Sequence, residues 1–309
     1  MLPFKLIYHP GYDLNLGDHV FPSVKFHQIR ARLLAEGFAA QEDFLEPLPA
    51  PDEDLMLVHT RKWVEKLKTG TLGYMEILRL EIPYSRRMVE AFCLAAGGTT
   101  LAARCALRDR ISYNVGGGFH HAFPDHGEGF CAINDIAVAI RRLLRDKQVE
   151  RAMVVDCDVH QGNGTAHIFA GDPAVFTLSI HQFHNFPAEK PPSTVDIHLP
   201  DNTGDREYLA QLGPAIEKGL REFRPRLVIY VAGADPYEQD KLGGLALTST
   251  GLKERDKLVY NLCLANNAAV AVTLAGGYAI NVEDTITVHC NTAQAALETI
   301  RTHRRTSAR

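Results

Sequence analysis

The stretch Val154-Val155-Asp156-Cys157-Asp158-Val159-His160-Gln161-Gly162-Asn163-Gly164 predicts the end of a buried strand. Residues 152–155 form an apolar run, and two carboxylates and an imidazole follow at alternate positions. Alternate residues of an extended chain point the same way, so Asp156, Asp158 and His160 could converge if the backbone stays extended to His160. Oxygen and nitrogen ligands of this kind suit catalytic zinc or iron, whereas the alternative interpretation is a capped strand with a polar turn.

Similar strand ends recur along the chain. Apolar runs at 111–115, 174–180, 226–232 and 269–275 each end in glycine or polar residues. These ends carry His120-His121, His181, Asp235-Pro236 and Gly276-Gly277-Tyr278. Helical patterns separate the strands, which predicts an α/β fold with one open parallel sheet flanked by helices. Because ligands bind such sheets at the carboxyl ends of the strands, we expect the active site at this edge.

The remaining pattern predicts one α/β domain over residues 1–301 and a frayed basic tail over 302–309. Strands are expected at 4–8 and 55–59, and Thr60 is expected to cap the helix that begins at Arg61. The irregular stretch 70–84 suggests a surface loop at the rim of the site. Further helices are expected at 23–37, 85–108, 132–147, 206–223, 250–266 and 283–301, the second broken at Gly97-Gly98 by a close helix crossing.

Composition excludes several classes of protein. The 309 residues carry 33 basic and 37 acidic side chains, a net charge of −4, with no basic stripe that would indicate a nucleic-acid partner. No apolar run approaches the ~20 residues of a membrane span, and the start of the chain lacks a signal-peptide pattern, so we expect a soluble, cytoplasmic protein. The six cysteines form no C-x-x-C pair, which favours free buried thiols.

A catalytic metal needs about three protein ligands and an open position. Asp158 and His160 supply two, and Asp235 is the best-placed third, although a helix cap or a turn before Pro236 is the alternative. The ligand set suits zinc or iron(II) and does not distinguish them.

The other polar residues at this edge suit proton transfer and oxyanion stabilisation. His120 and His121 would overfill a metal site, so acid–base roles fit them better. Asp156 could fix the tautomer of one imidazole and Asn163 could hold the other. The phenol of Tyr278 could donate to an oxyanion.

The chain resembles the zinc-dependent histone deacetylases, and within them the class IV branch. The resemblance runs from about residue 4 to about residue 300 and rests on five motifs: Gly116-Gly117-Gly118-Phe119-His120-His121, Gly129-Phe130-Cys131-Ala132, residues 156–164, Ala232-Gly233-Ala234-Asp235 with residues 240–245, and Gly276-Gly277-Tyr278. It implies an arginase-like fold and hydrolysis of an acyl-lysine amide.

The resemblance also implies a role for each matching residue. Asp158, His160 and Asp235 match zinc ligands, and His121 matches the general base and acid. His120 with Asp156 matches the electrostatic partner, and Tyr278 matches the residue that polarises the carbonyl. Asn163 stands where class I enzymes have an aspartate. Two further sets are implied: a substrate tunnel at Gly129 and Phe130, and a structural potassium site at Asp156, Asp158, His160, Ser179 and Ile180.

Several alternatives remain open at this point. An arginase-type ureohydrolase would need a further carboxylate at Gly162. A non-catalytic acyl-lysine binding module would typically lack the tyrosine or a ligand, and this chain keeps them. Acetylated polyamines or other small amides compete with acyl-lysine protein as substrates, and the class IV resemblance favours long-chain acyl groups. The oligomeric state is not predicted.

Overall fold

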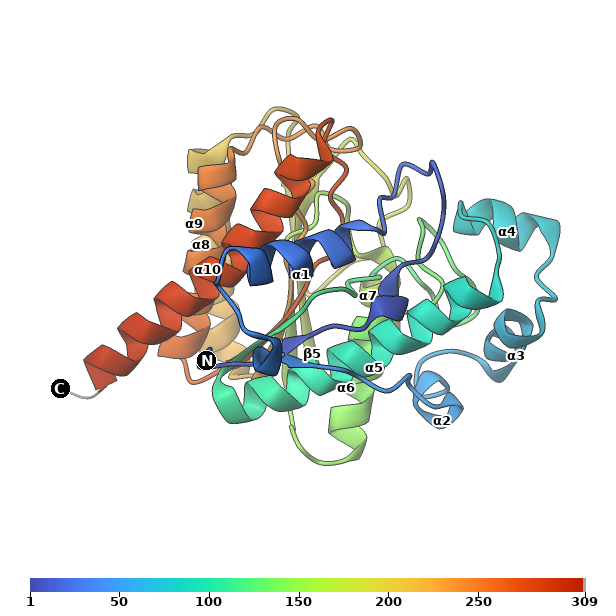
Figure 1. Ribbon diagram of the computed structural model, residues 1–309, viewed down its shortest axis with the longest axis horizontal. Coiled ribbons are helices and arrows are strands. Elements are labelled where there is room, and N and C mark those ends of the chain that lie inside the picture. The colour runs from blue at the N-terminus through green and yellow to red at the C-terminus, as the bar shows by residue number, and fades with distance from the viewer. Residues whose placement is uncertain (308–309) are drawn as a thin grey trace.

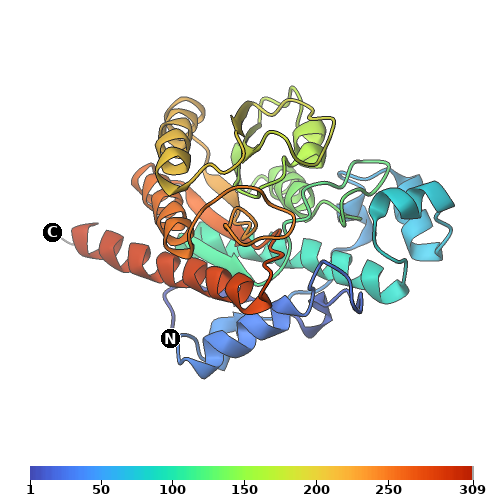
Figure 2. The ribbon, with the colours of Figure 1, turned by 90° about the horizontal axis from the view of Figure 1, so that it is seen from above.

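The computed structural model describes residues 1–307, and the side chains of residues 1–305. Its centre is one sheet of eight parallel strands in the order β2-β1-β3-β8-β7-β4-β5-β6 (Figures 1 and 2). The strands are β1 Leu6–Ile7, β2 Phe44–Leu45, β3 Ile111–Asn114, β4 Ala152–Asp156, β5 Val175–Gln182, β6 Val195–Leu199, β7 Leu227–Val231 and β8 Ala269–Thr273. The predicted open parallel sheet flanked by helices is therefore confirmed.

Helices cover both faces of the sheet. Helices α5 and α6 pack together against one face, and α1, α10, α9 and α8 form a row of neighbours on the other (Figure 1). The α-helices are α1 Lys25–Ala35, α2 Asp52–Leu55, α3 Arg61–Thr69, α4 Tyr74–Leu80, α5 Arg86–Asp109, α6 Asp135–Arg145, α7 Asn163–Ile168, α8 Asp205–Phe223, α9 Ser249–Ala265 and α10 Val282–Ser307. Two short 3-10 helices, η1 Pro10–Tyr12 and η2 Gln41–Asp43, lie near the N-terminus.

The central strands are buried on both faces, as expected of a parallel sheet covered by helices. In β4, Val154 packs with Ile136 and Ile140 of α6, whereas the next residue, Val155, belongs to the core on the other face. This alternation explains why the strand reads as a continuous apolar run. It also makes the polar residues at the strand ends stand out in the sequence.

The strands that carry the predicted site are neighbours. The order β3-β8-β7-β4-β5 places the five polar strand ends side by side, although the chain visits β7 and β8 last. Asp156 at the end of β4 pairs with Val231 at the end of β7 and with Ser179 of β5. The sheet therefore assembles the site from segments more than a hundred residues apart.

Two predictions near the N-terminus were wrong. Residues 55–59 form no strand, because α2 begins after Pro51 with three acidic residues in its first turn, and the chain continues in turns to His59. The expected loop 70–84 contains α4, which begins at Tyr74 after the N-cap residue Gly73, whose N–H donates to the Glu76 carboxylate at 2.7 Å. The cap at Thr60 is confirmed, since its hydroxyl accepts from Trp63 N–H.

Helix α5 runs without a break through Gly97 and Gly98, contrary to prediction. A Cβ atom on Gly97 would lie 1.9 Å from the Leu48 carbonyl oxygen, and one on Gly98 would lie 1.9 Å from the Tyr12 hydroxyl. Gly97 therefore admits the backbone of the loop at Leu48, and Gly98 admits the side chain of Tyr12 at the end of η1. A frayed tail was expected from residue 302, but α10 continues to Ser307, so that prediction was wrong for residues 302–307. Residues 308–309 lie outside the described residues. Strands β2 and β6 had not been predicted.

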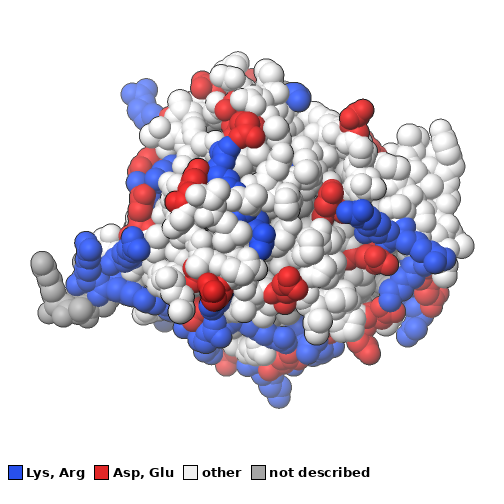
Figure 3. Space-filling model, viewed as in Figure 1, with Lys and Arg blue, Asp and Glu red and all other residues white. Residues whose placement is uncertain are grey.

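The surface carries mixed charge. On the face shown in Figure 3, Lys and Arg side chains gather near the end of α10 and elsewhere alternate with Asp and Glu. Within residues 1–307, no helix is long and apolar enough to cross a membrane. All six cysteines are free and buried.

Candidate metal and catalytic site

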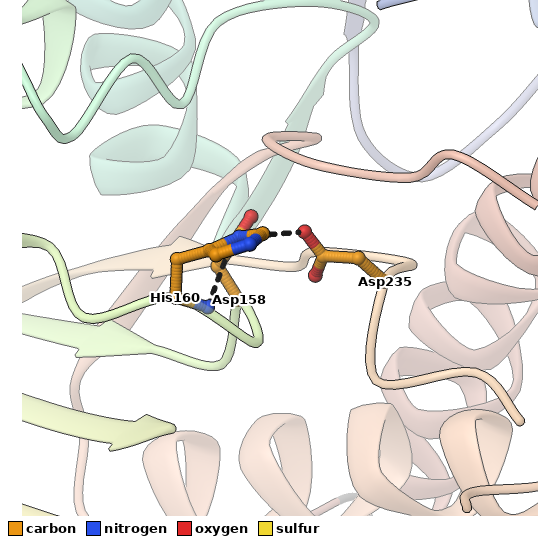
Figure 4. Close-up of side chains that lie close together, drawn as sticks. All are labelled: Asp158, His160 and Asp235. Atoms are coloured by element: carbon orange, nitrogen blue, oxygen red, sulfur yellow. Dashed lines mark hydrogen bonds and ion pairs between the residues drawn. The ribbon is translucent and has the colours of Figure 1, made fainter. Parts of the chain in front are cut away.

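Asp158, His160 and Asp235 form a buried cluster that could hold a metal ion. One ligand atom from each lies within 4.8 Å of the others. His160 Nδ1 is 3.0 Å from Asp158 Oδ1 and 3.4 Å from Asp235 Oδ2, so the imidazole faces both carboxylates (Figure 4). The first two residues lie in the loop after β4 and the third follows β7, the neighbouring strand.

The donor set fits a divalent metal. Asp235 Oδ1 accepts from Val159 N–H at 2.9 Å, but its buried Oδ2 has no hydrogen-bond partner among the described residues. Burial and the Asp158 carboxylate raise the pKa of Asp235 to about 7, as expected of a second carboxylate confined with the first. A cation with open coordination positions would satisfy the oxygen and neutralise this charge.

Gly276 keeps this space open. A Cβ atom there would lie 1.8 Å from Asp235 Oδ2 and 2.6 Å from Asp158 Oδ2. Its N–H donates to Asp158 Oδ2 at 2.7 Å. The glycine motif after β8 therefore orients one carboxylate of the candidate cluster as well as carrying the tyrosine.

Asp156 lies beside the cluster and not within it. Strand β4 ends at Asp156, so the backbone does not stay extended to His160 and the three side chains do not share one face. The carboxylate of Asp156 instead faces His120, whose Nδ1 donates to Asp156 Oδ2 at 2.7 Å. The condition for convergence, an extended backbone as far as His160, is not met, and Asp235 lies with Asp158 and His160 in the cluster as predicted.

His120 carries a positive charge in this arrangement. Burial alone would lower its pKa, but the carboxylates of Asp156 and Asp158 outweigh burial and raise the pKa to about 9. Its Nε2 is 3.8 Å from Asp158 Oδ1. The ring is therefore a buried cation at the edge of the metal cluster.

His121 is the opposite case. Burial and the neighbouring rings of His120 and His160 hold its pKa well below the usual range, so it is neutral. Its Nδ1 lies 2.7 Å from Asn163 Oδ1, and its ring packs edge-on against Phe186. A neutral imidazole whose Nδ1–H is donated leaves Nε2 with a free lone pair.

Tyr278 lies beside His160, with 6.5 Å between ring centroids. Its backbone N–H donates to Asp240 Oδ2 at 2.6 Å, which fixes the loop after β8. Burial and the Asp158 and Asp235 carboxylates raise its pKa well above the usual value, so the phenol keeps its proton and can donate it.

A small pocket joins these groups. Its lining includes the predicted tunnel residues Gly129 and Phe130 together with His121, His160 and Tyr278. Its described lining residues are Phe21, Gly118, Phe119, His120, His121, Gly129, Phe130, Cys131, Asp158, His160, Ala275, Gly276 and Tyr278. The lining combines the aromatic rings of Phe21, Phe119 and Phe130 with polar groups, which suits an alkyl stem that ends in an amide.

Several supporting residues had not been predicted. Asp135 accepts from the backbone N–H groups of Gly118 and Phe119, and so orders the loop before the histidines. The fully buried ammonium of Lys25 donates to Ala275 O at 2.8 Å, and burial lowers its pKa to about 8. An aspartate at the start of a helix usually indicates a helix cap, so the local sequence gave no sign that Asp135 accepts hydrogen bonds from the loop at Gly118 and Phe119.

The residues expected to hold potassium lie on β4, on β5 and in the loop after β4. Asp156 and Ser179 are register partners in these strands, and Ile180 follows Ser179. Ser179 Oγ lies 2.9 Å from His181 Nδ1.

Comparisons with known proteins identify the family. The Histone deacetylase domain matches residues 19–293. The chain is 40% identical over 294 residues to an uncharacterized protein of Picosynechococcus sp., covering 95% of this chain and 98% of that protein. It is 30% identical over 287 residues to Histone deacetylase 2 of Arabidopsis thaliana, covering 89% of this chain and 74% of that one. The protein therefore belongs to the histone deacetylase family.

Two further comparisons agree. A Probable deacetylase of Methanothermobacter thermautotrophicus is 35% identical over 257 residues, which cover 77% of this chain and 75% of that one. The crystal structure of the HDA15 HD domain superposes with a TM-score of 0.79 at 22% identity, covering 96% of this chain and 89% of that one. The structural match shows the shared fold.

Proposed function

We propose that this protein is a zinc-dependent deacylase that hydrolyses the amide bond between an acyl group and a lysine-type amine. The observation that carries the proposal is the buried Asp158, His160 and Asp235 cluster at a cavity that also contains His121 and Tyr278. Membership of the histone deacetylase family and the names of its relatives support the same reaction. Iron(II) suits the same ligands and is the alternative metal.

When bound, the metal supplies Lewis-acid polarisation of the amide carbonyl and lowers the pKa of a water molecule. His121 is neutral, so its Nε2 accepts a proton from the attacking water and later returns it to the leaving amine. Tyr278 donates its phenolic hydrogen to the oxygen that gains negative charge. His120, held positive by Asp156, stabilises negative charge in the same cavity.

The proposal also assigns roles to Asn163, to the residues that would contact the alkyl stem, and to a potassium site. Asn163 takes the place of an aspartate beside His121, as in the class IV and class II branches, so it agrees with the class IV assignment and separates the protein from class I. Gly129 and Phe130 line the cavity and would contact the alkyl stem. A potassium ion held by backbone oxygens of residues 156–160 and 180 with Ser179 would stabilise the loop that carries two metal ligands.

Turnover by the zinc-loaded protein tests this function. The substrates are lysine peptides with acetyl, octanoyl and myristoyl groups, with acetylated polyamines alongside, and the control is the His121→Ala variant. We expect hydrolysis of acyl-lysine, and the preferred chain length then defines the acyl group. Preference for an acetylpolyamine would move the substrate to small amines. No turnover of any substrate by protein with zinc bound would contradict the enzyme and support the binding module.

A further inference from the structure

The carboxamide of Asn163 has two chemically different ends, and the end that faces His121 decides which tautomer that imidazole adopts. With Oδ1 towards His121, the ring must carry its proton on Nδ1, and Nε2 is free to accept a proton. With Nδ2 towards His121, the proton would move to Nε2 and the base would be lost. Oxygen and nitrogen are nearly equal in size, so only a second partner can fix the orientation.

That second partner is Glu128. Asn163 Nδ2 donates to Glu128 Oε1 at 3.0 Å, on the side of the carboxamide away from His121. A carboxylate can only accept, so it excludes the reversed carboxamide, which would bring two oxygens together. The nearby His126 imidazole and the hydrogen bond from Asn163 outweigh burial and lower the pKa of Glu128, so it is ionised at neutral pH.

The backbone and side chain of Glu128 are both held in place. Its N–H donates to Cys131 O at 3.0 Å, and Cys131 N–H donates back to Glu128 O at 2.9 Å. This bridge encloses Gly129 and Phe130, which both have positive φ and line the cavity. On the outer side, His126 Nε2 is 3.6 Å from Glu128 Oε2, and the His126 ring stacks on Phe123.

We propose that Glu128 is a positioning residue that fixes the carboxamide of Asn163 and thereby holds His121 in the tautomer with Nε2 free. This role rests on the proposed function of His121 as the base. It extends the contacts that orient His121 by one residue, from Asn163 to Glu128. Glu128 also links the turn that forms the tunnel wall to the base, because one residue supplies the bridge to Cys131 and the bond to Asn163.

Two substitutions of similar size separate positioning from packing. Glu128→Met removes the acceptor, and we expect kcat to fall about tenfold or more with little change in KM, in the range typical of lost supporting hydrogen bonds. Glu128→Gln keeps an acceptor oxygen, and we expect it to recover most of that loss. Glu128, Asn163 and Glu189 line one surface groove, and the control is Glu189→Gln, which removes an exposed acidic charge from that groove.

A double-mutant cycle gives a sharper outcome. Asn163→Asp presents oxygen at both ends of the side chain, so no carboxamide remains to be oriented. It also places its carboxylate about 3 Å from that of Glu128, and we expect this repulsion to lower kcat. Adding Glu128→Gln replaces the repulsion with a hydrogen bond and should raise kcat. In the parent protein, Glu128→Gln should therefore lower kcat or leave it unchanged. In the Asn163→Asp variant, the same substitution should raise kcat.

The tautomer can also be observed without turnover. Long-range ¹H–¹⁵N spectra of histidine-labelled protein distinguish an Nδ1–H from an Nε2–H imidazole. We expect Nδ1–H at His121 in the parent protein and a mixture of tautomers in Glu128→Met. An unchanged tautomer together with an unchanged kcat in Glu128→Met would overturn the inference. Absence of turnover in the parent protein would instead contradict the proposed function, and the spectra would still test the role of Glu128.

Discussion

The imidazole rings of His120 and His121 lie 4.0 Å apart between centroids, yet His120 is protonated and His121 is neutral. The carboxylate of Asp156 keeps the pKa of His120 high, whereas burial beside that cation holds the pKa of His121 low. The Asp156 carboxylate therefore keeps one of two adjacent histidines charged, and burial beside that charge keeps the other neutral.

Replacement of His121 tests the role of the base. We expect His121→Ala to lower kcat by about 10²- to 10⁴-fold, the usual contribution of a positioned acid–base group. Metal content should not change, because His121 is not among the three cluster residues. Near-parental turnover in this variant would contradict the assignment.

Replacement of Tyr278 tests the oxyanion donor. Tyr278→Phe keeps the ring against Phe21 and Phe130 but removes the phenolic hydrogen. We expect kcat to fall about 10²- to 10³-fold, with KM nearly constant, because the bond forms mainly as charge develops on the oxygen. A change confined to KM would assign Tyr278 to substrate binding.

The tight approach at Gly97 predicts a stability effect. Gly97→Ala places a methyl group 1.9 Å from the Leu48 carbonyl oxygen, so the free energy of unfolding should fall by about 2 kcal/mol or more despite the better helix propensity of alanine. Gly213→Ala in α8 is the control, since its Cβ would lie 3.6 Å from Leu258, and we expect a change within about 1 kcal/mol. Urea unfolding measures both, and equal effects would contradict the contact.

Buried His59 predicts acid sensitivity. Its Nε2 accepts from Asn134 N–H at 3.0 Å, and burial lowers its pKa from 6.5 to about 4. Below pH 6.5, His59 binds a proton in the unfolded chain but stays neutral in the folded protein, so the free energy of unfolding falls as the pH drops from 6.5 to 4. The full loss is about 3 kcal/mol.

Urea unfolding from pH 7.5 to 4.5 measures this effect. His59→Gln should be less stable at pH 7.5 but should lose less stability on acidification than the parent protein. Parallel pH profiles for the two proteins would show that His59 is not responsible.

The sequence predicted the sheet because its strands are apolar runs with polar ends. The neighbouring positions of β3, β8, β7, β4 and β5 explain why those polar ends meet. Short elements carried too little pattern, and α4 was missed because its start depends on the Glu76 side chain. Strand β6 is only partly buried, so it lacked an apolar run.

Within the site, the contacts of Asp135 and Glu128 could not be predicted from spacing. Asp135 acts on backbone N–H groups of a loop 16 and 17 residues away, and Glu128 reaches Asn163 across 35 residues. Both depend on where the loops fold back over the sheet. Alternate spacing alone could not decide whether Asp156 converges with Asp158 and His160, because the strand ends at Asp156 and the chain turns.

The central claim is that Asp158, His160 and Asp235 bind the metal on which hydrolysis depends. The most direct measurement is zinc titration into metal-free protein, with bound metal and acyl-lysine turnover followed together, and with Asp235→Asn in parallel. We predict that turnover rises in proportion to bound zinc up to one equivalent, and that Asp235→Asn loses both. Turnover by metal-free protein, or unchanged zinc binding and activity in Asp235→Asn, would contradict the account.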